Sequence, residues 1–183
     1  EDITANLRTV KSLPLRIPVD ANGPQVPDYF VVRGEAFITI QDFDALNERL
    51  QEAGEKTYLN PRNPAAGSLR QLDPALTASR PLTLYGYQIA AADGPTPSTQ
   101  WELIQFLKAL GFPVAAEISQ QPNLEAAIAA CQAIGEKRDG LPYEVDGSVI
   151  KINDLRLAAN LGIVGKDPRG AIAFKFPARE VTT

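Results

Sequence analysis

Residues 29–54, YFVVRGEAFITIQDFDALNERLQEAG, decide the fold because their hydrophobic period changes part-way along the segment. Over residues 29–37 the side chains alternate between two faces, which predicts a β-strand. Over residues 40–53 apolar side chains recur every three or four positions, which predicts a helix with Asp42 as its N-cap and Gly54 as its end. A strand and an amphipathic helix therefore follow each other directly.

The rest of the chain mixes both kinds of element without a regular strand–helix–strand alternation. We expect further strands over residues 82–91, 143–152 and 172–176, and helices over residues 65–72, 101–110, 124–134 and 155–161. Such a mixture predicts an α+β fold in which largely antiparallel sheets are flanked by helices. No linker is long enough to require a cut, so we expect residues 1–183 to form a single domain.

The composition excludes several kinds of catalytic site. The chain has 183 residues, no histidine and a single cysteine, Cys131. Serine–histidine triads, cysteine–histidine pairs, histidine-bound zinc and cysteine cages for a metal are therefore excluded, and any chemistry must depend on Lys, Arg, Asp, Glu and Tyr. With 18 basic and 22 acidic residues the net charge is -4, which excludes a polycation that coats nucleic acid but not a local basic patch.

The sequence also bears on the cellular location of the protein. Hydrophobic residues make up 44% of the chain, enough for a packed core. The sequence contains neither a membrane span nor a signal peptide, so we expect a cytoplasmic protein. The chain starts at Glu1 and has no methionine, which we interpret as the sign of an excised or processed piece.

Charged side chains on predicted strands are the first candidates for a binding site. Alternation places Arg33 and Glu35 on one face, where a carboxylate is costly unless it is paired or binds something. The strand by itself favours the simpler alternative, a surface Arg33–Glu35 pair. Lys175 shares its strand face with two alanines, which leaves room for a phosphate or a ribose; an edge lysine lying along apolar surface is an equal alternative.

Asp146, Lys151 and Tyr87 are further candidates that need additional geometry. Asp146 and Lys151 are five residues apart, so only a bulge or turn at Asp146–Gly147 would bring both to one site. Tyr85 and Tyr87 share a strand face, where either ring would be able to stack on a base. Aromatic residues of the core or its rim are the more common explanation of such a pair.

Two arginines mark residues 60–71, NPRNPAAGSLRQ. In a helix, Arg62 and Arg70 would lie about two turns apart near one face, with the small residues Ala66 and Gly67 between them. Two guanidinium groups beside small residues suit the backbone of an extended polyanion such as nucleic acid. The alternative is a pair of solvent-exposed arginines on a short helix.

One short match is misleading. Residues 137–140, KRDG, have the form Lys-x-Asp-Gly that carries the nucleophilic lysine of covalent nucleotidyltransferases. A nucleophilic lysine needs a desolvated or cation-flanked site that lowers its pKa from about 10.4. We expect Lys137 to lie in an exposed polar loop, and we therefore reject it as the nucleophile.

Taken in order, these segments resemble the nucleotidyltransferase (adenylation) domain of bacterial NAD-dependent DNA ligase. The resemblance spans essentially the whole chain and is carried by residues 1–9 (EDITANLRT), 33–35 (RGE), 60–63 (NPRN), 66–73 (AGSLRQLD), 80–82 (RPL), 145–151 (VDGSVIK) and 173–177 (AFKFP). Each segment alone is weak, whereas the ordered set is very specific. The implied fold is that of the DNA ligase and mRNA capping enzyme nucleotidyltransferases.

The resemblance implies a chemistry and roles for particular residues. A ligase lysine attacks the α-phosphate of NAD and carries AMP, which moves to the 5′-phosphate of a nick in duplex DNA before the neighbouring 3′-OH displaces it. The implied NAD and AMP ligands are Glu35 (ribose), Lys151 (adenine), Lys175 (ribose or α-phosphate), Tyr87 (adenine stacking) and Asp146 (ordering of the pocket). Arg62 and Arg70 would bind phosphates of the nick or the nucleotide. We expect Glu35, Lys151 and Lys175 to surround one cavity.

The resemblance also implies parts that lie outside these residues. The nucleophilic lysine of the family lies upstream of Glu1, so this chain supplies no catalytic residue, and we expect that NAD does not adenylate it alone. NAD and a hydrated Mg²⁺ are the implied cofactors, with Mg²⁺ held by substrate oxygens and water rather than by ligands from this chain. The implied partners are nicked double-stranded DNA and the other domains of a monomeric enzyme of DNA replication and repair; no membrane is involved.

Two other hypotheses stay open. A non-catalytic module that binds nucleotide or DNA phosphate through the same surface would need no lysine motif just before Glu1. An ATP-using relative, such as an RNA ligase or a capping enzyme, would differ in its nucleotide preference.

Overall fold

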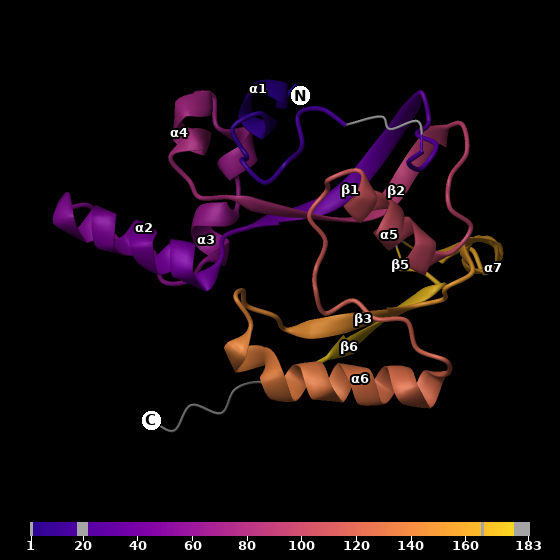
Figure 1. Ribbon diagram of the computed structural model, residues 1–183. Coiled ribbons are helices and arrows are strands. Elements are labelled where there is room, and N and C mark those ends of the chain that lie inside the picture. Colours follow the sequence, from indigo (N-terminus) through magenta and orange to yellow (C-terminus); the bar gives the residue numbers. More distant parts are fainter. Residues whose placement is uncertain (1, 18–21, 166, 178–183) are drawn as a thin grey trace. The chain divides into compact units, whose positions relative to one another are not determined.

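The computed structural model describes residues 2–17, 22–165 and 167–177, which belong to two compact units (Figure 1). The first unit comprises residues 1–96 and 103–115, and the second comprises residues 97–102 and 116–183. Both units combine short helices with two-stranded antiparallel sheets, so the α+β prediction is confirmed. That both units belong to a single domain stays a prediction.

The first unit is built on a long antiparallel ribbon. Strand β1 (Tyr29–Phe37) has the predicted bounds and pairs with β2 (Thr83–Asp93). Exposure alternates along β1, with Arg33 and Glu35 on the exposed face as predicted. At the register shift between Arg33 and Gly34, β2 inserts one extra residue, Tyr87.

Aromatic and aliphatic side chains fasten helix α5 (Gln100–Ala109) to this ribbon. The ring of Phe30 from β1 meets the rings of Phe106 and Phe112 edge-on, with a centroid separation of 6.4 Å in each pair. After the helix, the chain turns at Gly111, whose φ of 87° is strained for any residue with a Cβ. The side chains that the helix buries are Leu103, Ile104, Phe106 and Leu107.

Helix α2 (Ile40–Glu52) begins at the predicted residue, but its N-cap is Thr39 rather than Asp42. The Thr39 hydroxyl accepts a hydrogen bond from the Asp42 backbone N–H (3.1 Å) and donates one to Asp42 Oδ2 (2.6 Å). Asp42 is therefore not the N-cap, because Thr39 is the last residue with extended backbone and Asp42 already lies in the first turn. Gly54, with φ of 71°, ends the helix as predicted.

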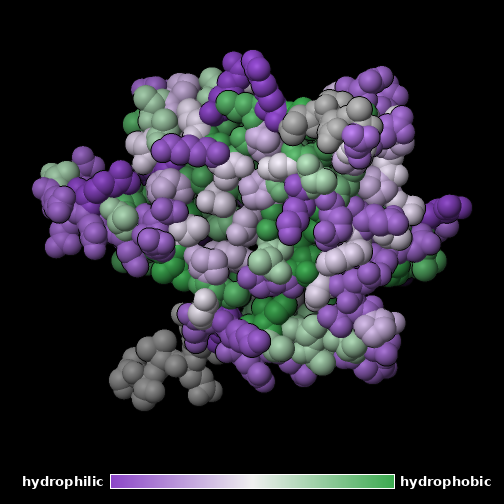
Figure 2. All heavy atoms as spheres, viewed as in Figure 1, coloured by the Kyte–Doolittle hydropathy of each residue, from purple (hydrophilic) through white to green (hydrophobic). Residues whose placement is uncertain are grey.

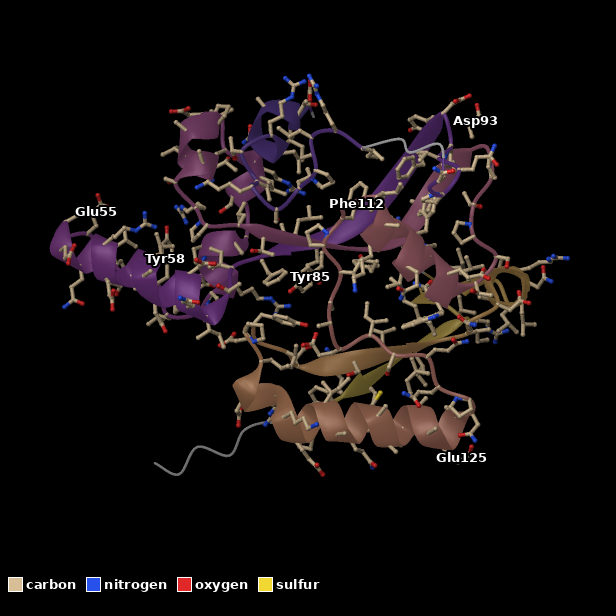
Figure 3. The ribbon with its side chains drawn as sticks, viewed as in Figure 1. Glu55, Tyr58, Tyr85, Asp93, Phe112 and Glu125 are labelled. Atoms are coloured by element: carbon tan, nitrogen blue, oxygen red, sulfur yellow. The ribbon has the colours of Figure 1, made fainter. Side chains whose placement is uncertain are left out.

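A small core lies under α2 and the ribbon. It consists of Val10, Ile38, Leu46 and Leu82, with partly buried residues packed around it. Hydrophilic side chains cover much of the visible surface of α2 (left in Figure 2). Tyr58 lies beside α2 (Figure 3), where the Asn47 amide binds both its backbone N–H and its carbonyl, at 2.9 Å each.

The predicted helix over residues 65–72 is wrong. The segment instead forms two short pieces, α3 (Arg62–Ala65) and a 3-10 turn, η1 (Ser68–Arg70). Extended backbone at Ala66 and a φ of 70° at Gly67 break the helix between them. Two more short helices pack against this segment, α1 (Thr4–Leu7) and α4 (Pro74–Ala78), the latter capped by Asp73.

The second unit has a helix packed on a short ribbon. Strands β3 (Gly147–Lys151) and β6 (Ala171–Lys175) pair in antiparallel register, and helix α6 (Leu124–Lys137) lies along them (Figure 1). Asn123 caps α6 as predicted, its side chain accepting from Ala126 N–H at 2.8 Å.

The remaining elements of this unit are small. They are the 3-10 turn η2 (Arg138–Gly140), helix α7 (Leu155–Asn160), and the hairpin of β4 (Ile163–Val164) and β5 (Asp167–Pro168). In the part of the chain that the structure describes, no helix is both long and apolar enough to cross a membrane.

Candidate functional site

The end of the β3–β6 ribbon brings Asp146 and Lys175 together. Lys175 lies directly opposite Gly147, and the Asp146 carbonyl accepts a hydrogen bond from Phe176 N–H at 2.9 Å. The Lys175 ammonium lies 2.8 Å from Asp146 Oδ2, and the two side chains are 68% and 75% exposed. An ion pair this exposed contributes less than about 1 kcal/mol, so a bound anion would compete for Lys175 at little cost.

Lys151 lies at the other end of the same ribbon, opposite Ala171. Residues directly opposite each other in an antiparallel pair point to the same face, and every second residue shares that face. The register therefore places Lys151 and Lys175 on one face, together with Ala171 and Ala173 as predicted for Lys175. Burial lowers the pKa of the Lys151 ammonium below its ordinary value.

No bulge lies within β3 itself, and Asp146 lies at a bend just before its first residue. Pairing runs without a register shift from Gly147 to Lys151. Asp146 forms an ion pair with Lys175, which lies on the adjacent strand. The pairing of β3 with β6 thus brings Lys175 next to Asp146, at the end of the ribbon opposite to Lys151.

On the β1–β2 ribbon, Glu35 is exposed and lies directly opposite Tyr85. The Tyr85 ring meets Phe37 edge-on, with centroids 4.8 Å apart, and Tyr85 projects from the ribbon in Figure 3. Tyr87 is half-buried at the register shift. Within the described residues Arg33 and Glu35 form no ion pair with each other, so the simpler explanation of Glu35 is not what the structure shows.

Arg62 and Arg70 do not share the face of one helix, because the helix that would align them is broken. Both side chains are exposed, Arg62 at the start of α3 and Arg70 at the end of η1. A third arginine, Arg80, is half-buried: its guanidinium lies 5.1 Å from the centre of the Tyr58 ring, and its Nη1 donates to the Pro64 carbonyl at 3.3 Å.

A chain of buried hydrogen bonds beneath these arginines was not predicted. Ser68 Oγ donates to the Pro64 carbonyl, and Thr77 Oγ1 donates to the Ser68 carbonyl at 2.7 Å. Asn6 Nδ2 donates to Thr77 Oγ1 at 3.0 Å and to the Gln71 carbonyl at 2.7 Å. Asn6, Ser68 and Thr77 are only 6%, 2% and 1% exposed, which is rare for polar residues unless their hydrogen bonds are satisfied.

The sequence carries only a faint signal of this network. Asn6 and Ser68 lie in the segments that support the family resemblance, whereas Thr77 follows them in an ordinary short helix. Their contacts join residues up to 71 positions apart, which no local pattern reveals.

Comparison with known proteins supplies the family. Residues 1–179 match the family model of the NAD-dependent DNA ligase adenylation domain. The chain belongs to this family. The predicted resemblance is therefore confirmed.

Curated relatives of the adenylation domain are DNA ligases. The DNA ligases of Chloroflexus aurantiacus (strain J-10-fl) and Roseiflexus castenholzii are each 50% identical to this chain, over 189 and 190 residues. The DNA ligase of Methylococcus capsulatus is 48% identical over 184 residues. The matches cover 100% of this chain but only 27%, 26% and 27% of the three relatives, so the chain spans about a quarter of their length.

The misleading Lys-x-Asp-Gly match lies on the surface, as predicted. Lys137 is the exposed last residue of α6, and Asp139 and Gly140 lie in the exposed turn η2. Because Lys137 is exposed, it lacks the desolvated environment that activates a nucleophilic lysine, and the match stays rejected as the nucleophile.

The described residues form no metal cage, since they contain no group of three or more acidic or cysteine side chains able to hold an ion. Glu35 lies exposed on β1, and Asp146 lies exposed just before β3, where it already contacts Lys175. These residues by themselves do not fit a dedicated Mg²⁺ site. Magnesium ions usually bind through substrate phosphates and keep several water ligands, which needs no such cage.

Proposed function

We propose that this adenylation domain is the nucleotide-binding part of a ligase that seals nicks in duplex DNA through a lysyl-AMP intermediate formed from NAD. The family match supports this proposal, and the observation that carries it is the common face of Lys151 and Lys175 on the β3–β6 ribbon. The nucleophilic lysine would come from sequence upstream of Glu1, and the remaining domains from the rest of a full-length, monomeric, cytoplasmic protein.

Each charged residue has a role that its position supports. Lys175 would bind the ribose or the α-phosphate, exchanging Asp146 for a phosphate oxygen, and Asp146 would hold its ammonium in place beforehand. Negative charge grows on phosphate oxygens during transfer, so fixed cations stabilise the transition state. A cation near the reacting lysine would also lower the pKa of that lysine by like-charge repulsion.

For the other ligands of AMP, the proposed roles follow from the resemblance of their sequence segments to the family. Lys151 would contact adenine, Glu35 would bind the ribose, and Tyr87 would stack on the adenine ring. We propose that the domain has a nucleotidyltransferase-like fold. The match also favours NAD over ATP as the donor of AMP, while Mg²⁺ would accompany the nucleotide phosphates.

DNA is the proposed second partner. Arg62 and Arg70 are exposed guanidinium groups on neighbouring short turns, as suits contacts to successive phosphates of the nicked strand or to the nucleotide. The similarity to the DNA ligases of Chloroflexus aurantiacus and Roseiflexus castenholzii supports a nicked duplex as the substrate.

Nucleotide binding to the full-length ligase tests this proposal. We expect Glu35→Ala and Lys175→Ala each to weaken AMP or NAD binding about tenfold or more, because each removes a charged hydrogen-bonding group. Glu48→Ala and Lys108→Ala are matched controls, since each removes a charged side chain that is exposed on a helix. If neither Glu35→Ala nor Lys175→Ala weakens binding, the assignment of the pocket fails.

A further inference from the structure

We infer that Thr77 is a positioning residue for Arg70: its buried hydroxyl fixes the turn that carries Arg70, so that the guanidinium meets a DNA phosphate in a preset orientation. The inference rests on the proposed function, in which Arg70 binds DNA. According to this inference, buried side chains of the first unit contribute to the affinity for DNA.

The backbone is held on both sides of Arg70. Arg70 is the last residue of η1 and lies between Ser68 and Gln71, whose carbonyls both accept buried or part-buried side-chain hydrogen bonds. Thr77 Oγ1 binds the first at 2.7 Å and Asn6 Nδ2 binds the second at 2.7 Å. Figure 1 shows the two helices that supply these donors, α1 and α4, close to each other in this unit.

The Thr77 hydroxyl joins the two anchors into one network. It donates its single proton to the Ser68 carbonyl and accepts a hydrogen bond from Asn6 Nδ2 at 3.0 Å. Thr77 is 1% exposed, so we expect no water molecule to take over the hydrogen bonds of its hydroxyl when that hydroxyl is removed. Only a hydroxyl both donates and accepts in so small a space.

The turn has little stability of its own. A 3-10 turn of three residues has few internal hydrogen bonds, and Gly67 before it is the residue with the greatest backbone freedom. The direction in which Arg70 leaves the surface is therefore set by the network rather than by the turn. Preorganisation of this kind raises affinity because less freedom is lost on binding.

Affinity of the full-length ligase for a nicked duplex, measured by fluorescence anisotropy at several salt concentrations, tests the inference. We expect Thr77→Val, which keeps the volume but loses the hydroxyl, to weaken binding about three- to tenfold. Thr77→Ser keeps the hydroxyl and loses only the methyl group, so it should bind DNA like the wild type. Arg70→Ala should lower the dependence of log affinity on log salt by about one phosphate contact.

The double variant Thr77→Val with Arg70→Ala separates positioning from general stability. If Thr77 acts through Arg70, the double variant binds no more weakly than Arg70→Ala alone. If the two losses multiply, or if Thr77→Ser is as weak as Thr77→Val, Thr77 acts on the fold in general and the inference is wrong.

Two further outcomes remain distinct. If Arg70→Ala leaves both the DNA affinity and its salt dependence unchanged, Arg70 does not bind DNA and the inference about Thr77 is wrong. The residues proposed to bind the nucleotide are not affected by that result. If Thr77→Val does not fold, judged by loss of AMP transfer from NAD to the enzyme, Asn6→Ala takes its place: it removes the anchor on Gln71, and the same non-additive pattern with Arg70→Ala is expected.

Discussion

Gly147→Ala is predicted to open one end of the β3–β6 ribbon. A Cβ at Gly147 would lie 2.5 Å from the Phe174 carbonyl oxygen and 3.2 Å from Lys175 Cα. A carbon and a carbonyl oxygen in contact rest about 3.3 Å apart, so the strands must separate by about 0.8 Å. The obstacle is backbone and has no rotamer to change. Overpacking of this kind costs about 1–3 kcal/mol, and we expect about 2 kcal/mol at this end of the ribbon.

Hydrogen exchange of the full-length ligase measures this cost at single amides. A loss of about 2 kcal/mol makes local opening about 30-fold more frequent. The Phe176 amide, which donates to the Asp146 carbonyl, should lose protection by about this factor. The Ile152 amide, which donates to the Gly170 carbonyl at the opposite end of the ribbon, should lose less.

Gly140→Ala is the matched control, because a Cβ there meets no heavy atom within 4 Å. We expect it to leave protection of the Phe176 amide unchanged. Unchanged protection in Gly147→Ala, or equal loss in both variants, would refute the steric argument. Displacement of Lys175 in Gly147→Ala should also weaken nucleotide binding in proportion to the lost protection.

Two further predictions concern charge and capping. Burial lowers the pKa of Lys151 below its ordinary value of 10.5, so in the alkaline range between the two values the unfolded chain binds more protons and stability rises with pH. Lys151→Met should flatten that rise in urea titrations across this range, whereas the exposed Lys108→Met should not; an unaltered slope in Lys151→Met contradicts the prediction. Asn123→Ala removes the acceptor of the Ala126 N–H and should cost about 1 kcal/mol, seen as roughly fivefold faster exchange of that amide. Gln132→Ala, an exposed change in the same helix, should have no such effect, and equal exchange in both variants would count against the capping role.

Elements with a strong local pattern were predictable. The bounds of β1 and the Asn123 cap of α6 are confirmed because each depends on neighbours within a few residues. The helix predicted over residues 65–72 does not form, because the backbone is extended at Ala66 and Gly67 adopts a left-handed conformation. Thr39 rather than Asp42 caps α2 because both residues are good caps and only backbone geometry separates them.

The candidate site was predictable to the level of single strands. Alternation placed Glu35 on an exposed face and Lys175 beside two alanines. It did not reveal that Lys175 contacts Asp146, because that ion pair joins residues 29 positions apart. The buried network of Asn6 and Thr77 was out of reach for the same reason.

By itself, the order of residues determined the kind of elements, the family and the chemistry that the chain excludes, because these depend on residue types and on spacing over a few positions. Tertiary structure alone decided that Lys151 and Lys175 share a face, and that Thr77 supports the turn of Arg70. Strand register and buried hydrogen bonds join residues that are far apart in the sequence. They therefore depend on the free energy of the whole folded chain and not on any local pattern.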